Sequence, residues 1–118
     1  MRSFETAVRL NPRFATAWRN LGLAEMNRGR PAEALAHFQR AAELRPDDAP
    51  AAFFVGATHV QLRRPADAVP HLERAIALDE SHAQAHLQLA IALRQLGRLA
   101  ESNEHQRIAV ELDPSLAR

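Results

Sequence analysis

Histidines are the residues in this sequence whose type and spacing most suggest a chemical site. Three of them recur at 34-residue intervals, and each follows an acidic residue by four positions: Glu33 and His37, Asp67 and His71, Glu101 and His105. An imidazole and a carboxylate four residues apart share one face of a helix, and both groups are ligands of zinc. The pattern therefore raises the possibility of a ladder of metal sites along the chain.

Geometry argues against that ladder. Neighbouring helices pack about 8–10 Å apart. Zinc–nitrogen bonds are only about 2 Å long, so two of these histidines cannot reach one ion. His82 and His86 are also four residues apart, but His82 lies at an expected helix boundary and His86 at an expected packing position. We therefore expect helix-surface pairs and no metal site.

Motifs of enzymatic chemistry are absent from the sequence. It contains no cysteine, no HExxH, no GxSxG and no glycine-rich phosphate loop, and it has only four glycines. The carboxylates at Glu33, Asp67 and Glu101 recur with the 34-residue period, which is typical of surface positions in a repeat. The sequence predicts a protein that is not an enzyme and that uses no cofactor.

Composition and charge argue against nucleic acid and membrane as partners. The 118 residues carry a net charge of +1, and all 15 basic side chains are arginines spread along the chain, so no basic patch is formed. No apolar run approaches the ~20 residues of a membrane span, and MRSFETAVRLNP lacks the apolar segment of a secretory signal. We expect a cytoplasmic protein, and the arginine- and alanine-rich usage is typical of a GC-rich bacterial genome.

The 34-residue period governs the whole chain and not only its histidines. Four similar hexamers begin 34 residues apart: AVRLNP from residue 7, AAELRP from 41, AIALDE from 75 and AVELDP from 109. Within each period apolar residues recur three and four apart, which indicates helices. The repeat divides a single domain, 1–118, into a partial unit at 1–14 and complete units at 15–48, 49–82 and 83–116.

Breaking residues split each complete unit into two helices. In NRGRP, Gly29 suits a helix end and Pro31 suits the start of the next helix, and RRP at 63–65 and GRL at 97–99 occupy the same place later. We expect seven helices, at 3–10, 15–28, 31–44, 49–62, 65–78, 83–96 and 99–112. Because no unit can bury its apolar face alone, the units must stack as a solenoid.

Unit 49–82 departs from its neighbours at two places. Arg63 stands where they have Gly29 and Gly97. If the left-handed turn is kept there, a residue other than glycine costs roughly 1–2 kcal/mol. Pro70 lies inside an expected helix, where its missing N–H should distort the first turn or delay the helix start. We expect this unit to be the least stable.

Residues 15–48, ATAWRNLGLAEMNRGRPAEALAHFQRAAELRPDD, resemble a tetratricopeptide repeat. The likeness consists of the W-x2-L-G start, the Ala-x3-Phe of the second helix and two later positions: Trp18, Leu21, Gly22, Ala34, Phe38, Ala41 and Pro46. The later units are similar but depart from the pattern at Ala52, Glu80, His86, Ser102 and Gln106. The resemblance implies an all-α fold, a right-handed α-solenoid of antiparallel helix pairs. It also implies a concave groove that holds a peptide or partner protein.

The resemblance further implies which first-helix residues line that groove: Arg19, Leu23, Met26, Asn27, Phe53, Ala57, Val60, Gln61, Leu87, Ile91 and Arg94. The middle of this set is apolar, and an exposed apolar patch usually marks an interface. We therefore expect the groove to bind an apolar or amphipathic peptide or helix of a partner protein, with the two arginines orienting acidic groups at the rim.

Capture of a C-terminal carboxylate, as in co-chaperone relatives, is not expected. That function uses several cations, whereas the matching places in this sequence hold a single one: Arg19, Leu23, Phe54, Gln84 and Gln88. A structural role is the alternative. The apolar lining would then pack against further repeats or a second copy, and apolar residues near the chain ends would favour self-association. The chain would serve as a spacer in a larger multidomain protein, which could have an enzyme domain elsewhere.

Overall fold

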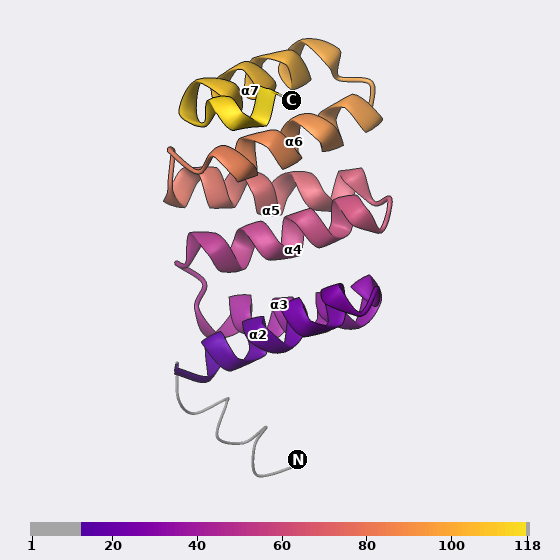
Figure 1. Cartoon of the computed structure of the whole chain (residues 1–118), viewed down its shortest axis with the longest axis vertical. Helices are drawn as coiled ribbons and strands as arrows, with labels where there is room; N and C mark the ends of the chain where they lie inside the picture. Colours follow the sequence, from indigo (N-terminus) through magenta and orange to yellow (C-terminus); the bar gives the residue numbers. More distant parts are fainter. Residues whose placement is uncertain (1–12, 118) are drawn as a thin grey trace.

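The computed structural model describes residues 13–117, and the regular structure in that part is helical (Figure 1). It contains α2 Arg13–Asn27, α3 Pro31–Leu44, α4 Ala49–Gln61, α5 Pro65–Leu78, α6 Ala83–Gln95, α7 Leu99–Leu112 and a short 3-10 helix, η1 Pro114–Ala117. The bounds of these six α-helices lie within two residues of the predicted ones. The seventh expected helix, at 3–10, lies outside the described residues.

The helices form antiparallel pairs, α2–α3, α4–α5 and α6–α7, and the pairs stack one upon the next (Figure 1). The second helix of each pair contacts the first helix of the following pair, and α4 also contacts α6 directly. The described part is elongated, with extents of 48 × 25 × 23 Å. Each pair therefore covers an apolar face of its neighbour, as the repeat predicts.

Individual side chains set where the helices begin. Asp48 caps α4, where its Oδ2 accepts a hydrogen bond from the Ala51 N–H at 3.2 Å. His82 caps α6 in the same way, because its Nδ1 accepts from the Ala85 N–H at 3.1 Å. The helices α3 and α5 begin with a proline, whose fixed φ suits the first turn and whose missing N–H is not needed there.

The turn inside each helix pair contains a residue in the left-handed region. Gly29 and Gly97 have φ values of 73° and 80°, and Arg63 has a φ of 63° at the equivalent place. The left-handed turn is therefore kept at Arg63, which is the condition on which the expected cost depends. A Cβ added to either glycine would meet no atom within 4 Å, so backbone conformation, not crowding, favours glycine at these two positions.

The helix α5 contains Pro70 in its interior, and the predicted delay of the helix start is wrong. α5 begins at Pro65, and the Ala68 N–H donates to the Arg64 carbonyl at 3.1 Å. The carbonyl that the missing N–H of residue 70 would have served belongs to Ala66. Both Pro70 and Ala66 are exposed, so water can replace the lost hydrogen bond.

Two glycines permit close packing inside the first two pairs. A Cβ on Gly22 would lie 2.5 Å from Cε1 of Phe38, and a Cβ on Gly56 would lie 2.5 Å from Cγ of Leu72. Both large side chains are almost fully buried, with 1% and 0% of their surface exposed. The absence of a side chain on the first helix therefore makes room for a large apolar side chain on the second.

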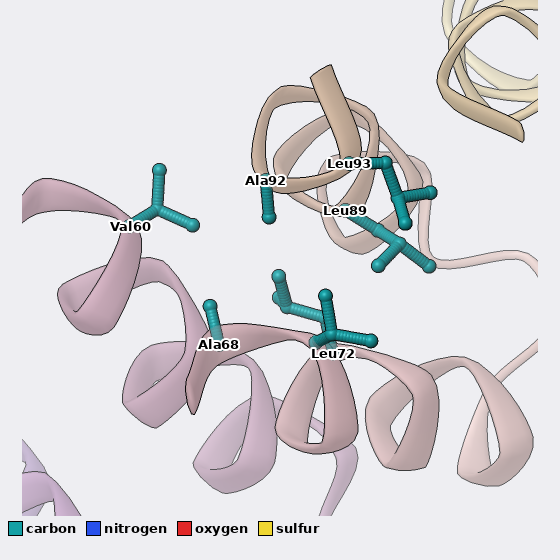
Figure 2. Close-up of a cluster of buried hydrophobic side chains, with 7 residues drawn as sticks. Val60, Ala68, Leu72, Leu89, Ala92 and Leu93 are labelled. Carbon is teal, nitrogen blue, oxygen red and sulfur yellow. The ribbon is translucent and has the colours of Figure 1, made fainter. Parts of the chain in front are cut away.

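The apolar core runs along the stack between successive pairs. One cluster joins α4 and α5 to α6: Val60, Ala68, Val69, Leu72, Leu89, Ala92 and Leu93. Figure 2 shows Leu72 directed from α5 towards Leu89 and Leu93 of α6. A second cluster joins α3 to α4: Ala34, Leu35, Phe38 and Val55. These contacts between pairs fix how the first helices are placed relative to one another.

Candidate protein-interaction face

The expected groove-lining residues lie on α2, α4 and α6, and we call them the first-helix face. They fall into rows at 34-residue intervals, with one further residue on each of two helices: Arg19, Phe53 and Leu87; Leu23, Ala57 and Ile91; Met26, Val60 and Arg94; Asn27 and Gln61. α4 and α6 lie directly against each other, whereas α2 meets α4 mainly through α3. The structure thus brings the α4 and α6 parts of the face together most closely.

The row formed by Leu23, Ala57 and Ile91 is the most accessible apolar part of this face. Leu23 and Ile91 each expose 37% of their surface, more than any other apolar residue of this face. Ala57, between them in register, is half-buried. Its small side chain leaves a step between two larger ones, which is a shape that an apolar side chain of a partner can fill.

Phe53 lies at the centre of the row that it forms with Arg19 and Leu87. Its ring is 4.8 Å from that of His82 and meets the ring of Phe54 edge-on at 5.3 Å. It is half-buried and packs against two core clusters, each of which joins α4 and α5 to α6. The core therefore holds Phe53 in place while part of its ring stays accessible. Leu87 is likewise half-buried.

Val60 and Met26 contribute less to the face than the sequence suggested. Val60 exposes only 7% of its surface and belongs to the cluster around Leu72, so it cannot contact a partner in this arrangement. Met26 is half-buried and packs against the cluster around Phe38. Their register position points towards the next helix pair, which covers both residues.

The two arginines of the face already have partners within the chain. Nη1 of Arg19 lies 3.6 Å from Oδ2 of Asp48, the residue that caps α4. Both side chains are about 30% exposed. Arg94 donates from Nη2 to Oε1 of Gln106 on α7 at 2.9 Å. Arg94 therefore spans its own helix pair at the edge of the face. Asn27 and Gln61 are exposed.

The regularly spaced histidines occupy a position that the sequence analysis missed. Each stacks on a ring from the first helix of its own pair: His37 on Trp18 at 5.4 Å, His71 on His59 at 5.6 Å and His105 on His86 at 5.2 Å between ring centroids. The acid at Glu101 is held by Arg98 through bonds of 2.9 and 2.7 Å. The sequence signal was the shared register of Trp18 and His86, which marks both as packing positions.

Burial changes the proton affinity of three of these rings. It lowers the pKa of His59, an effect that the neighbouring His71 reinforces. Burial likewise lowers the pKa of His71 and that of His105. Among residues 13–117, no three His, Cys, Asp or Glu side chains come close enough to hold a metal ion. The stacked histidines are structural elements of the helix pairs.

Comparison with known proteins decides the family. Two family profiles, both described as tetratricopeptide repeat, match residues 13–81 and 56–117. The chain belongs to the tetratricopeptide repeat (TPR) family. No curated protein matches the sequence.

Solved TPR structures agree with the fold. The first TPR of Spaghetti (RPAP3), bound to the HSP90 peptide SRMEEVD, is 20% identical with a TM-score of 0.84, over 88% of this chain and 82% of that one. MamA is 22% identical with a TM-score of 0.82, over 96% and 66%. MamA 41-end from Desulfovibrio magneticus RS-1 is 28% identical with a TM-score of 0.78, over 85% and 56%. These likenesses confirm the TPR solenoid.

None of the helices within residues 13–117 is long and apolar enough to cross a membrane.

Proposed function

We propose that this TPR chain is a protein-interaction module whose first-helix face binds an apolar or amphipathic segment of a partner protein. The observation that carries the proposal is the accessible apolar row of Leu23 and Ile91, each 37% exposed, next to the half-buried Phe53 and Leu87. A helix with apolar residues three and four apart, or an extended peptide with alternating ones, presents side chains to such a row.

The charges of the face favour an apolar ligand over a C-terminal carboxylate. The RPAP3 domain binds an HSP90 peptide, SRMEEVD, which is acidic. In the present chain Arg19 is paired with Asp48, and Phe53 and Leu87 stand at the positions 34 and 68 residues further on. Since Arg19 already has an acidic neighbour and Arg94 lies at the edge of the face, bonded to Gln106, the face is a poor receptor for a multiply charged tail.

Peptide selection provides a direct test. Short amphipathic peptides would be selected from a displayed library against the purified chain, and the affinity of a selected peptide measured by fluorescence anisotropy. The double variant Leu23→Ser/Ile91→Ser should weaken binding about tenfold or more, since exposed side chains of this size act as binding anchors. Leu99→Ser is the matched control, because Leu99 is 58% exposed on α7, away from the face.

The comparison of the double variant with the control decides the interpretation. If peptide binding is weakened by Leu99→Ser but not by Leu23→Ser/Ile91→Ser, the first-helix face is not the binding site. We prefer these substitutions to changes at Phe53, because Phe53 packs against two core clusters and a polar residue there would disturb the fold.

Self-association is a second candidate, and exposed leucines at the two ends of α7 favour it. Leu99 exposes 58% and Leu112 exposes 42% of its surface, at the two ends of this helix. Sedimentation velocity over a range of concentrations tests this candidate: Leu99→Ser/Leu112→Ser should shift an oligomer towards monomer, and a wild-type chain that is monomeric throughout would exclude it.

A further inference from the structure

A cavity of about 470 Å³ lies away from the first-helix face, between the second helices α3 and α5. Ala52 and Val55 of α4 line it together with Gln39 and Ala42 of α3 and His71 of α5. Cavities of roughly 300–1,000 Å³ with apolar walls and a few polar groups are the usual form of small-molecule sites. The question is why this one opens in the second helix pair.

The cavity lies where neighbouring pairs have a ring. Trp18, Ala52 and His86 share one register position, 34 residues apart. The ring of Trp18 stacks on His37 with 28° between the planes, and the ring of His86 stacks on His105 with the same angle. In the second pair the methyl group of Ala52 replaces the ring, and His71 stacks instead on His59. A ring-sized volume beside His71 is therefore not filled by any of residues 13–117.

The surroundings of Ala52 are as small as those of its counterpart in the first pair. Ala52 clusters with Ala75 and Ala85. In the register of the first pair these positions are Ala41 and Ala51, which are also alanines. The alanines next to Ala52 are thus the same as those in the register of Trp18, while Phe53 and Ile76, which also pack there, stand where the first pair has Arg19 and Ala42.

The polar groups at the rim favour a neutral ring. The charged side chains that line the cavity are two acids and two arginines: Glu43, Asp48, Arg45 and Arg74. The guanidinium of Arg74 is fixed across the rim, because Nε and Nη2 donate to the Pro46 carbonyl at 3.1 and 2.7 Å. Burial lowers the pKa of His71, so its ring is uncharged at neutral pH. An uncharged imidazole and a planar guanidinium are both stacking surfaces for an aromatic ring.

We propose that this cavity is a binding site for a neutral, planar aromatic ring, which takes the place that Trp18 and His86 hold in the adjacent pairs. The site is independent of the first-helix face, since it opens between the second helices and its lining shares no residue with that face. The ring can belong to a free aromatic molecule or to a tryptophan side chain of a peptide, and these two sources present the same chemistry.

Titration followed by NMR tests the site in the whole chain. Indole and N-acetyltryptophanamide would be added to labelled protein, with the Ala52 methyl and His71 ring signals as reporters. We expect at least one of them to shift both signals saturably, and the tighter of the two identifies the source of the ring. Benzyl alcohol and its saturated analogue cyclohexylmethanol test planarity. Failure of both indole compounds, or equal affinity for the two alcohols, would overturn the proposal.

A filling substitution provides the matched variant. Ala52→Trp should restore the missing ring, raise the melting temperature and weaken indole binding at least about tenfold. Ala24→Trp is the control, because Ala24 is exposed on α2 and does not line the cavity, so indole affinity should stay unchanged. Ala52→Leu fills the same space with a smaller group and serves if the tryptophan variant does not fold. Indole affinity that is unchanged in the filled protein contradicts the assignment.

Discussion

The Nδ1 atoms of His86 and His105 lie 3.0 Å apart, and this contact joins α6 to α7. His86 Nε2 is 3.2 Å from the Glu80 carbonyl, which can only accept a hydrogen bond. With one hydrogen on each ring, His86 carries it on Nε2 and accepts at Nδ1, and His105 donates from Nδ1. The hydrogen positions on the two rings are thus linked across the helix pair.

We predict that mild acid destabilises the chain. Burial lowers the folded-state pKa of His59, His71 and His105 below the unfolded value of 6.5, so the unfolded chain binds more protons near that pH. This stability is therefore fully present above about pH 6.5 and is lost as pH falls from there through the lower folded-state pKa values. Urea unfolding at a series of pH values measures this as a falling free energy of unfolding.

Facing charges modify the size of this pH dependence without reversing it. At the His59–His71 pair they are Asp67 and Arg64, and at His105 they are Glu73, Glu101 and Glu104. The carboxylates favour protonation, but burial remains the largest effect at all three histidines. His71→Phe keeps a ring against His59 and should flatten the pH profile. An identical profile in that variant contradicts the assignment.

Arg63→Gly should stabilise the chain. Arg63 has a φ of 63°, and glycine adopts this conformation without the Cβ clash. Relief of that clash is worth about 1–2 kcal/mol, and the greater freedom of glycine in the unfolded chain offsets part of it, so a gain of about 1 kcal/mol is expected. Chemical denaturation measures the gain, and Gly97→Ala, at a φ of 80°, should lose stability by a similar amount. A lower free energy of unfolding in Arg63→Gly would contradict this prediction, because it would mean that contacts of the arginine side chain stabilise the fold by more than the left-handed backbone conformation costs.

Gly56→Ala should destabilise the chain although alanine is the better helix former. The new Cβ would lie 2.5 Å from Cγ of Leu72 and 3.3 Å from the Ala68 carbonyl oxygen. Overpacking of this kind costs about 1–3 kcal/mol. Leu72→Val on the same background should recover part of the loss, since it shortens the side chain that clashes. Thermal unfolding of the two single variants and the double variant measures the coupling, and purely additive effects would contradict the contact.

Much of the fold was predictable because the same helix-start and turn signals recur at the same positions in successive repeat units. The position of Pro31 and Pro65 at helix starts, and the left-handed turn shared by Gly29, Arg63 and Gly97, are visible as aligned letters. The effect of Pro70 on α5 was harder to predict, because its cost depends on whether the carbonyl that it leaves unpaired is exposed. Sequence pattern does not report that exposure.

The candidate sites were predictable only in part. The 34-residue register placed Leu23, Ala57 and Ile91 in one row of the first helices. It did not predict the burial of Val60, because that depends on how the next helix pair packs over the end of α4. Periodicity placed each regularly spaced histidine beside an acid. Which ring it stacks on depends on side-chain rotation and on residues of another helix, as in the pairing of His71 with His59. The cavity at Ala52 is visible only once those rotations are known.

The most direct test of the central claim is NMR mapping of a selected amphipathic peptide on the full chain. We predict that the largest shifts cluster at Leu23, Phe53, Ala57, Leu87 and Ile91, on the first helices α2, α4 and α6. Shifts concentrated instead on the second helices α3, α5 and α7, with these five residues unchanged, would contradict binding at the first-helix face.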